Sequence, residues 1–547
     1  MTLNRRTVLG AGSALAVVAT AAPSRATPRP ADPAASPPPP SPVFPVAETT
    51  FGKVRGFEAG GIKQFKGIPY GAATSGKNRF MPPKKPAPWA GERACYGHGQ
   101  TSPQGVANAN IDYTRLIQWD EQAGGMGEDM LHLNVFTPAL RDGKKRPVMV
   151  SFHGGGFTTG SNNLTGYYGD PLARFGDVVV VTPNHRLASF GYIDLVGAGA
   201  PSDFRYAGVA GVMDMVAVLE WVRDNAEAFG GDPSRVMIWG QSGGGAKTST
   251  MMGVPSARGL FHRAAIQSGS LLRVTPRERA TMLAEKLLKQ LGLTGKDMAK
   301  LQAIPWEQIL AAQLALSAAD PTVDFSPVLD GEIIPQHPFD PVAPAASADV
   351  PVIISSALED AALRLVNFDL DEDGLAKLAE ERFPGHGAEI VRLYRAHYPD
   401  KSPYLVQAMI LTDSMLRRAV VRQAERKHAL GRAPAYVYTW EWPTPAFNGK
   451  FGAIHGTDVG TAFHNTRGAM YGETPSAHAM ADRHAGAWVA FAATGDPNHA
   501  GIPHWDPYTP ETRASMVFAD AMAAENDHRA DFRKLWDAIN PPPGPRG

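Results

Sequence analysis

The sequence predicts an α/β fold with a large, mostly parallel central sheet and helices on both faces. Short apolar runs rich in valine and isoleucine recur along the chain, and such runs suit parallel strands that are buried on both faces. They occupy residues 148–152, 178–181, 236–239, 350–354 and 436–438. Helical patterns lie between them, as in residues 212–229, where apolar side chains recur at helical spacing. Alternation of strands and helices is typical of α/β architecture.

The composition argues against two classes of partner. The chain has 547 residues, and its 53 Lys and Arg residues balance its 53 Asp and Glu residues. Because no broad basic field exists to hold a phosphate backbone, we expect no nucleic acid partner. After the N-terminal segment no stretch is long and apolar enough to span a bilayer, so we expect no stable membrane insertion. The expected partner is a small-molecule substrate, and the oligomeric state is left open.

The N-terminus predicts export from the cytoplasm. Arg5 and Arg6 precede an apolar stretch over residues 8–22, and small residues before position 27 suit cleavage after Ala26. The paired arginines resemble a twin-arginine signal, although Gly10 stands where lysine is often found. An ordinary Sec signal or an uncleaved anchor is the alternative. The sequence therefore predicts a signal peptide over residues 1–26 and a periplasmic or extracellular protein.

The remaining chain is predicted to be one large domain. Nine prolines fall between Pro28 and Pro45, which indicates an extended linker over residues 27–47. No internal repeat or second linker divides residues 48–540, so we expect one α/β domain there. The proline-rich tail, residues 541–547, is expected to be disordered.

A short glycine-rich motif predicts a nucleophilic serine. Residues 240–244 read Gly-Gln-Ser-Gly-Gly, with an apolar run at 236–239 before them and a small-residue helical pattern at 245–252 after them. A nucleophile elbow needs this strand–turn–helix context, in which a tight turn lifts the serine oxygen above the sheet. The alternative is a glycine-rich turn that happens to contain Ser242.

A second glycine-rich motif predicts an oxyanion hole. Residues 153–157 read His-Gly-Gly-Gly-Phe and directly follow the apolar run at 148–152. Backbone N–H groups in such a loop can bind the negative charge that develops on a carbonyl oxygen during acyl transfer, typically for about 3–4 kcal/mol per donor. The alternative is a flexible glycine turn; a phosphate-binding P-loop is excluded because no Lys-Ser or Lys-Thr pair follows the glycines.

With these motifs the chain resembles the type-B carboxylesterases, the family that includes cholinesterases and bacterial p-nitrobenzyl esterases. The resemblance runs from about Phe51 to Trp536. Further motifs that carry it lie at residues 65–70, 127–135, 229–233, 261–270, 327–331 and 494–498.

The resemblance implies the α/β-hydrolase fold and hydrolysis of carboxylic esters through an acyl-enzyme. It makes Ser242 the nucleophile and His455 the general base. The oxyanion donors would be the amides of Gly155, Gly156 and Gly243. No cofactor is expected, and no metal either, since no ligand cluster with metal spacing is evident.

Two adjacent carboxylates, Glu359 and Asp360, are candidates for the triad acid. Aligning the strand at 350–354 with the family pattern puts Asp360 on the triad acid, and Glu359 then takes the place of its acidic neighbour. A shift of one residue would reverse these roles. Asp458 and Ser268 match positions that help to orient the histidine and the acid.

Two other functions stay open. The same triad could cleave amide, carbamate or lactone bonds, and a cholinesterase-like domain can be catalytically silent, although such domains typically lose the nucleophile. The elbow departs from the family's usual Gly-Glu-Ser-Ala-Gly at Gln241 and Gly243, which removes a charge beside the serine. Cys95 is the only cysteine, so no intramolecular disulfide is possible, and it is expected to be a small buried hydrophobe rather than a nucleophile.

Overall fold

A computed structural model describes residues 43–106, 112–117 and 123–540. The predicted signal peptide at 1–26, residues 27–42 of the predicted linker and the tail at 541–547 lie outside the described residues. The described residues belong to a single compact unit.

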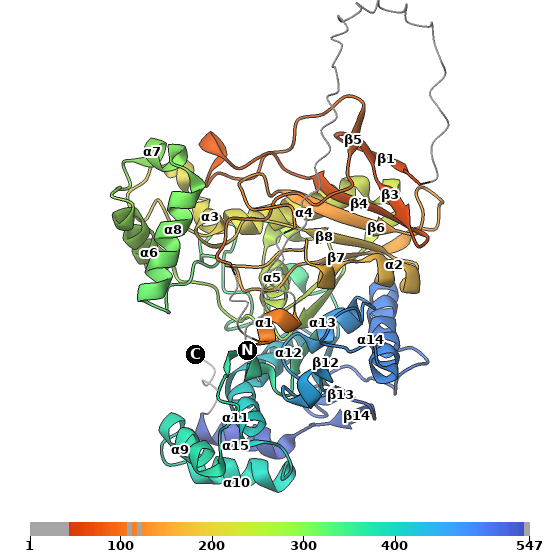
Figure 1. Ribbon diagram of the computed structural model, residues 1–547, viewed down its shortest axis with the longest axis vertical. Coiled ribbons are helices and arrows are strands. Elements are labelled where there is room, and N and C mark those ends of the chain that lie inside the picture. Colours follow the sequence, from red (N-terminus) through yellow and green to blue (C-terminus); the bar gives the residue numbers. More distant parts are fainter. Residues whose placement is uncertain (1–42, 107–111, 118–122, 541–547) are drawn as a thin grey trace, which may run out of the picture. The chain divides into compact units, whose positions relative to one another are not determined.

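An 11-stranded sheet runs through the middle of the described residues, in the order β14-β13-β12-β11-β10-β9-β7-β8-β6-β4-β3 (Figure 1). All pairs from β8 to β13 are parallel, and the strands at the two edges pair antiparallel. This arrangement confirms the predicted fold class. The strands are β3 (Phe57–Ala59), β4 (Ile62–Pro69), β6 (His132–Thr137), β7 (Arg146–Ser151), β8 (Val179–Pro183), β9 (Gly231–Gln241), β10 (Arg263–Gln267), β11 (Val352–Ala357), β12 (Ala435–Trp440), β13 (Ala514–Phe518) and β14 (Ala523–Asn526). A separate small sheet joins β1 (Val46–Thr49), β2 (Gly52–Arg55) and β5 (Glu92–Ala94).

The central strands contain continuous apolar runs because each face of the sheet lies in a hydrophobic core. In β7, Val148 and Val150 belong to one core cluster, whereas Met149, between them, belongs to the other. Successive side chains of a strand point to opposite faces of the sheet. The continuous apolar runs in the sequence are therefore the signature of a sheet that is covered on both sides.

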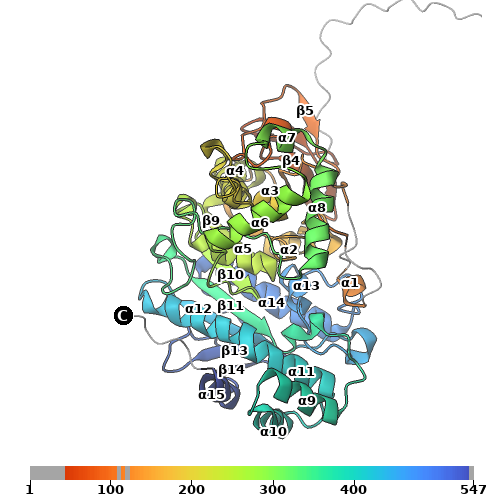
Figure 2. The same cartoon turned by 90° about the vertical axis from the view of Figure 1, so that its left-hand side faces the viewer.

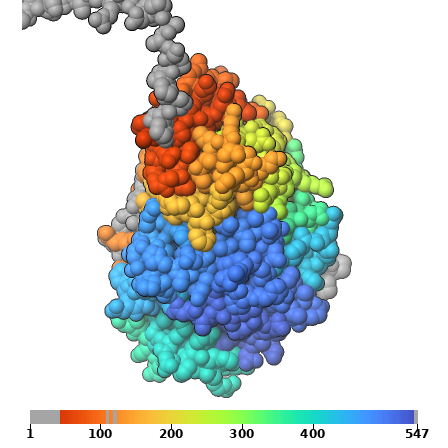
Figure 3. All heavy atoms as spheres, turned by 90° about the vertical axis from the view of Figure 1, so that its right-hand side faces the viewer, coloured from red at the N-terminus to blue at the C-terminus, as the bar shows by residue number. Residues whose placement is uncertain are grey.

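Helices supply the two covers. Helices α2 and α14 contribute to the core that contains Met149, and α4, α5 and α12 contribute to the core that contains Val148. Figure 2 shows α12 running along β11 and β13. In Figure 3 the blue C-terminal residues meet the orange N-terminal residues on one face, in agreement with the contact between α14 and α2. The helices are α1 (Asp112–Leu116), α2 (Asp170–Gly176), α3 (Ala188–Gly191), α4 (Ala210–Asn225), α5 (Gly243–Met252), α6 (Arg277–Gln290), α7 (Met298–Ala303), α8 (Trp306–Ala319), α9 (Glu372–Arg382), α10 (Gly387–His397), α11 (Pro403–Leu411), α12 (Arg418–Ala429), α13 (Thr457–Ala462), α14 (Pro475–Thr494) and α15 (Ala530–Ile539).

Several predicted boundaries shift in the structure. Strand β1 begins at Val46, inside the predicted linker, because Ala47 is buried in the core and the strand pairs with β2. The helix expected over 212–229 is α-helical only to Asn225 and continues as a 3₁₀ turn to Phe229, which Gly230 ends with a φ of 74°. Within the described part of the chain, no helix combines the length and the apolar character needed to cross a membrane.

Candidate active site

Ser242 occupies a sharp turn between β9 and α5. Its φ of 59° and ψ of −122° lie in a region that residues other than glycine rarely adopt. The turn is tight enough to require small neighbours: a Cβ atom on Gly244 would lie 2.1 Å from the carbonyl oxygen of Phe152. The Ser242 N–H donates to the Gln267 carbonyl of β10 at 2.8 Å, which fixes the turn to the sheet. The strand–turn–helix context expected from the sequence is therefore present.

The glycine loop at residues 154–156 lies against this turn. A Cβ atom on Gly243 would lie only 2.3 Å from the backbone nitrogen of Gly156, so the two loops touch. Gly155 and Gly156 have φ values of 84° and 60°, a conformation that favours glycine. Among the described residues, the amides of Gly155, Gly156 and Gly243 donate to no recorded protein acceptor. This is the condition that a set of oxyanion donors must meet.

Buried polar side chains hold the glycine loop at residues 154–156 in place. The Lys247 ammonium, on α5, is fully buried and donates to the His153 carbonyl at 2.7 Å. The Tyr167 hydroxyl accepts the Gly154 N–H at 3.0 Å. The His153 ring stacks on His185 with 4.9 Å between ring centres. Burial, reinforced for both rings by Lys247, holds their pKa values well below the ordinary histidine value, so the support is provided by neutral rings at physiological pH.

His455 and Asp360 are brought together. The His455 Nδ1 atom hydrogen-bonds Asp360 Oδ1, and the other oxygen of Asp360 accepts the Ala357 N–H at 3.0 Å. Asp360 is fully buried and His455 is 8% exposed. The Tyr113 hydroxyl of α1 donates to the His455 carbonyl at 2.9 Å. The carboxylate thus fixes the orientation and the tautomer of the ring and leaves Nε2 for an incoming proton.

Glu359 has different partners. Its carboxylate forms an ion pair with Lys401 and accepts the Ala453 N–H at 2.8 Å. The side chain is fully buried, and this burial raises its pKa against the opposing effect of Lys401. The two adjacent carboxylates therefore have different roles. Asp360 contacts His455, whereas Glu359 links Lys401 to the segment before His455.

Asp458 and Ser268 are also buried, but among the described residues neither side chain forms a hydrogen bond or ion pair with His455 or Asp360. Asp458 accepts the Tyr438 hydroxyl at 2.8 Å, and its backbone carbonyl accepts the Gln267 side-chain amide at 3.2 Å. Ser268 has a φ of 45°, and its hydroxyl has no recorded partner among the described residues. Since Gln267 also holds Ser242, Asp458 connects the serine turn to the helix that follows His455.

We expect the Asp458→Asn variant to change how stability depends on pH. Burial, with a contribution from Asp360, raises the Asp458 pKa from 3.8 to about 6. A carboxyl group with a raised folded pKa stabilises the fold below its unfolded pKa, and this contribution is lost as pH rises through about 6. The free energy of unfolding of Asp458→Asn relative to wild type should therefore increase by about 2 kcal/mol between about pH 4.5 and about pH 7.5.

Urea denaturation at several pH values measures this difference. Asp373→Asn, which alters an exposed carboxylate on α9, is the matched control and should show no such trend. Parallel pH profiles for wild type and Asp458→Asn would contradict the prediction.

Sequence reasoning missed the residues that hold the site from a distance, namely Tyr113, Tyr167, Lys247, Gln267, Lys401 and Tyr438. None belongs to a motif with a fixed spacing to the residue that it contacts. Lys247, the one charged residue of the small-residue helix α5, was the one available signal, because a buried lysine needs a partner.

A pocket is lined by Gln241 and Gly456, the chain neighbours of Ser242 and His455, although neither Ser242 nor His455 is among its lining residues. The Gln241 side-chain nitrogen is buried without a recorded partner among the described residues. The other lining residues are mostly aromatic or aliphatic: Tyr113, Leu116, Ile117, Leu164, Gly166, Tyr167, Val459, Gly460, Arg467, Met470 and Tyr471.

Two further expectations concern metals and Cys95. Within the described ranges, no group of three or more His, Cys, Asp or Glu side chains could hold a metal ion.

Cys95 is a free, buried cysteine, and burial raises the pKa of its thiol to about 12. The thiol is therefore protonated at neutral pH and is a poor nucleophile.

A serine elbow on a mostly parallel sheet, facing a glycine loop with unpaired amides, defines a hydrolase with the α/β-hydrolase fold. Known proteins of similar sequence show to which family of hydrolases the chain belongs. The chain belongs to the carboxylesterase family, whose model matches residues 44–536. It is a carboxylic ester hydrolase of the serine type, and the resemblance to carboxylesterases is confirmed.

Three relatives illustrate the match. The para-nitrobenzyl esterase of Bacillus subtilis is 30% identical over 504 residues, which cover 89% of this chain and 98% of that protein. The phenmedipham hydrolase of Pseudarthrobacter oxydans is 32% identical over 495 residues, covering 87% and 95%. A crystal structure of a carboxylesterase from Geobacillus stearothermophilus is 33% identical, covers 90% of this chain and 99% of that one, and superimposes with a TM-score of 0.76.

Proposed function

We propose that the protein cleaves carboxylic esters with a triad of Ser242, His455 and Asp360. The observation that carries this proposal is the buried hydrogen bond between His455 Nδ1 and Asp360. This hydrogen bond keeps the proton of the neutral His455 ring on Nδ1, so the Nε2 atom has a free lone pair. The strained turn at Ser242 and the unpaired amides of Gly155, Gly156 and Gly243 support the same reading.

The first half of the reaction forms an acyl-enzyme. Ser242 Oγ attacks the ester carbonyl carbon while His455 Nε2 takes the hydroxyl proton. The carbonyl oxygen becomes negatively charged and accepts hydrogen bonds from the three glycine amides. His455 then gives its proton to the alcohol oxygen, the C–O bond breaks, and the alcohol leaves. Asp360 stabilises the imidazolium that exists between these steps.

The second half repeats the chemistry with water. His455 takes a proton from water as the water oxygen attacks the acyl carbon, and the same amides hold the oxygen anion. Collapse of this intermediate returns the proton to Ser242 Oγ and releases the carboxylic acid. Each proton that His455 takes is given back, so the enzyme ends as it began.

A covalent labelling experiment tests the nucleophile. A fluorophosphonate probe should modify wild-type enzyme on Ser242, identified by mass spectrometry of the tryptic peptide, and enzymatic activity should be lost in parallel. An enzyme that hydrolyses esters but carries the label on another residue would overturn the assignment. Absence of both labelling and activity would favour a catalytically silent binding domain.

The pocket lined by Gln241 and Gly456 supports a proposal for the substrate class. Its aromatic and aliphatic lining suits an ester with an apolar acyl or alcohol group. A panel of p-nitrobenzyl esters of increasing acyl length, together with matched amides and phenmedipham, separates esterase activity from amide and carbamate cleavage. We expect kcat/KM to be highest for the esters.

We also propose that the protein is exported, by the twin-arginine route. The paired arginines Arg5 and Arg6 before an apolar stretch support this proposal. Replacing both arginines by lysine should leave the full-length enzyme in the cytoplasm of a bacterial host, whereas the wild-type enzyme should be exported and begin at residue 27. Unimpaired export of the double variant would indicate the Sec route.

A further inference from the structure

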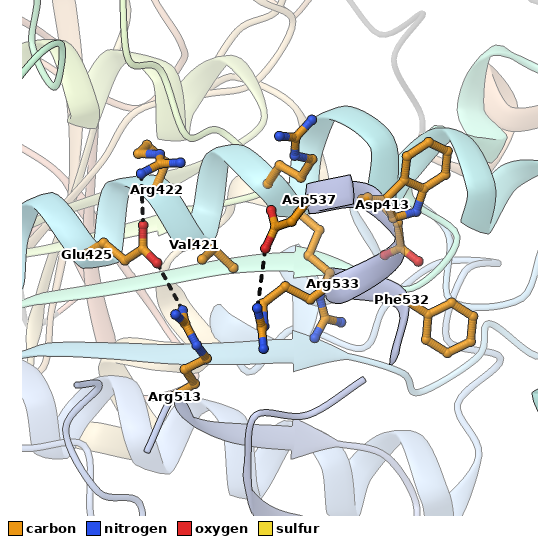
Figure 4. A pocket seen from close by; sticks show the side chains of 11 residues that line it. Asp413, Val421, Arg422, Glu425, Arg513, Phe532, Arg533 and Asp537 are labelled. Atoms are coloured by element: carbon orange, nitrogen blue, oxygen red, sulfur yellow. Dashed lines mark hydrogen bonds and ion pairs between the residues drawn. The ribbon is translucent and has the colours of Figure 1, made fainter. Parts of the chain in front are cut away.

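A second cavity lies away from the site around Ser242, between the C-terminal helix α15, helix α12 and the turn that precedes α12 (Figure 4). Its volume is about 180 Å³. None of the residues that line it belongs to the triad or to the oxyanion loop. The cavity is therefore not part of the proposed catalytic machinery, and its chemistry needs a separate account.

The cavity is rich in arginine. Five arginines line it against three carboxylates: Arg417, Arg418, Arg422, Arg513 and Arg533 against Asp413, Glu425 and Asp537. The rest of the lining is Val421, Phe532 and Trp536. An excess of positive charge next to an apolar wall is the arrangement that binds an anion with an apolar body.

The three carboxylates are already paired. Glu425 lies 3.2 Å from Arg422 and 2.9 Å from Arg513, as the dashed lines in Figure 4 show. Asp537 lies 3.3 Å from Arg533, and that arginine has a second partner in Asp527 at 2.7 Å. Asp413 forms its ion pair with Arg529 at 2.5 Å. These pairs leave the two remaining arginines of the cavity without a carboxylate of their own.

Arg417 and Arg418 are the unpaired cations. Within the described ranges neither forms an ion pair, and each donates only to a backbone carbonyl, Arg417 to that of His528 and Arg418 to that of Asn540. The Arg417 Nη1 atom is buried and has no hydrogen-bond partner there. The Arg417 side chain is half-buried and lines the cavity, so an anion there would compensate its positive charge, whereas the enclosed Nη1 atom lies out of reach.

Burial lowers the Arg417 pKa, and the neighbouring Arg529 lowers it further, while Asp413 and Glu441 act in the opposite direction. Burial likewise lowers the Arg418 pKa, against the opposing effect of Asp537. Both shifts mean that the protein itself does not fully compensate these charges. The backbone is also unusual here, because residues Thr412–Arg417 form a π-helical turn, and such turns are frequent at functional sites.

We propose that this cavity binds a small organic carboxylate, with its two oxygens on Arg417 and Arg418 and its apolar body against Val421, Phe532 and Trp536. The planar guanidinium groups match the carboxylate geometry. A volume of about 180 Å³ corresponds to about six water molecules, which suits an anion of the size of benzoate. Ester hydrolysis releases anions of this class, so the cavity can bind the enzyme's own acid product.

Isothermal titration of the mature, full-length domain with sodium benzoate tests the proposal. We expect binding with a Kd of about 1 mM or tighter. Arg417→Gln should weaken it at least about tenfold, whereas Arg382→Gln, an exposed arginine on α9, should leave it unchanged. Equal affinities of the two variants, or no benzoate binding to wild type, would overturn the proposal.

Titrations with two further ligands test separately whether the carboxylate and the apolar body are recognised. Benzamide has the same shape without the charge and should bind at least about tenfold more weakly than benzoate; equal binding would exclude recognition of the carboxylate. Inorganic phosphate that binds as tightly as benzoate would exclude a role for the apolar wall. If Arg417→Gln does not fold, Val421→Phe keeps both arginines and fills the cavity, and it should abolish benzoate binding while leaving ester hydrolysis unchanged.

Discussion

Replacing Ser242 by alanine is expected to reduce kcat by about 10⁶-fold, because the members of such a triad act as a unit and the hydroxyl oxygen forms the bond to the substrate. Alanine keeps the Cβ atom at this strained turn, so the backbone conformation at φ 59° meets no new contact. The oxyanion loop and the pocket remain, and substrate binding should change little. Burst and steady-state kinetics with a p-nitrophenyl ester measure the loss.

The control for this variant is its stability. Thermal unfolding and circular dichroism should match wild type, since a single oxygen at a half-buried position is removed. If the variant kept more than about a hundredth of the wild-type kcat, another residue would have to be the nucleophile. Cys95 is a poor substitute, because burial raises the pKa of its thiol to about 12.

Replacing Asp360 by asparagine is expected to reduce kcat by about 10⁴-fold. Asparagine keeps the size of the side chain, but its amide can donate to His455 Nδ1 and so favours the tautomer with the proton on Nε2. The histidine can then no longer accept the proton of Ser242. The fully buried position of Asp360 excludes solvent that could otherwise replace the lost acceptor.

Glu359→Gln is the matched control, since it changes the adjacent buried carboxylate by the same chemistry. It breaks the ion pair with Lys401 but leaves the hydrogen bond between Asp360 and His455 intact. We expect a loss of stability and at most about a tenfold loss of kcat. The opposite result, a large loss of kcat in Glu359→Gln and a kcat close to wild type in Asp360→Asn, would assign the triad acid to Glu359.

The fold could be predicted from local patterns because the central strands are buried on both faces. The runs around Val148 and Val236 are apolar without alternation for that reason alone. Strand ends were predicted less well. Strand β11 begins at Val352 rather than at residue 350, since Pro351 has no N–H to donate to a ladder, and β9 extends back to Gly231, well before its apolar run.

In the active site, too, some features could be predicted from local sequence and others could not. The elbow and the glycine loop are local motifs, and their glycines are visible in the sequence; in this structure a Cβ atom would lie 2.3 Å from Gly156 N at Gly243 and 2.1 Å from Phe152 O at Gly244. The choice between Glu359 and Asp360 was not local. It depends on Lys401, in the connection between α10 and α11, and on the position of Ala453. A single sequence contains no pattern that links these residues.

The order of strands has a consequence for how the enzyme folds. The proposed catalytic groups follow β7, β9, β11 and β12, and Ser242 and His455 are more than two hundred residues apart in the sequence. Each parallel pair between these strands closes a long loop of chain, which makes its formation entropically costly and slow. Catalytic activity is therefore a late reporter of folding. In refolding from denaturant, the helical circular dichroism signal should return first, and esterase activity should follow only when the sheet has assembled from β7 to β12.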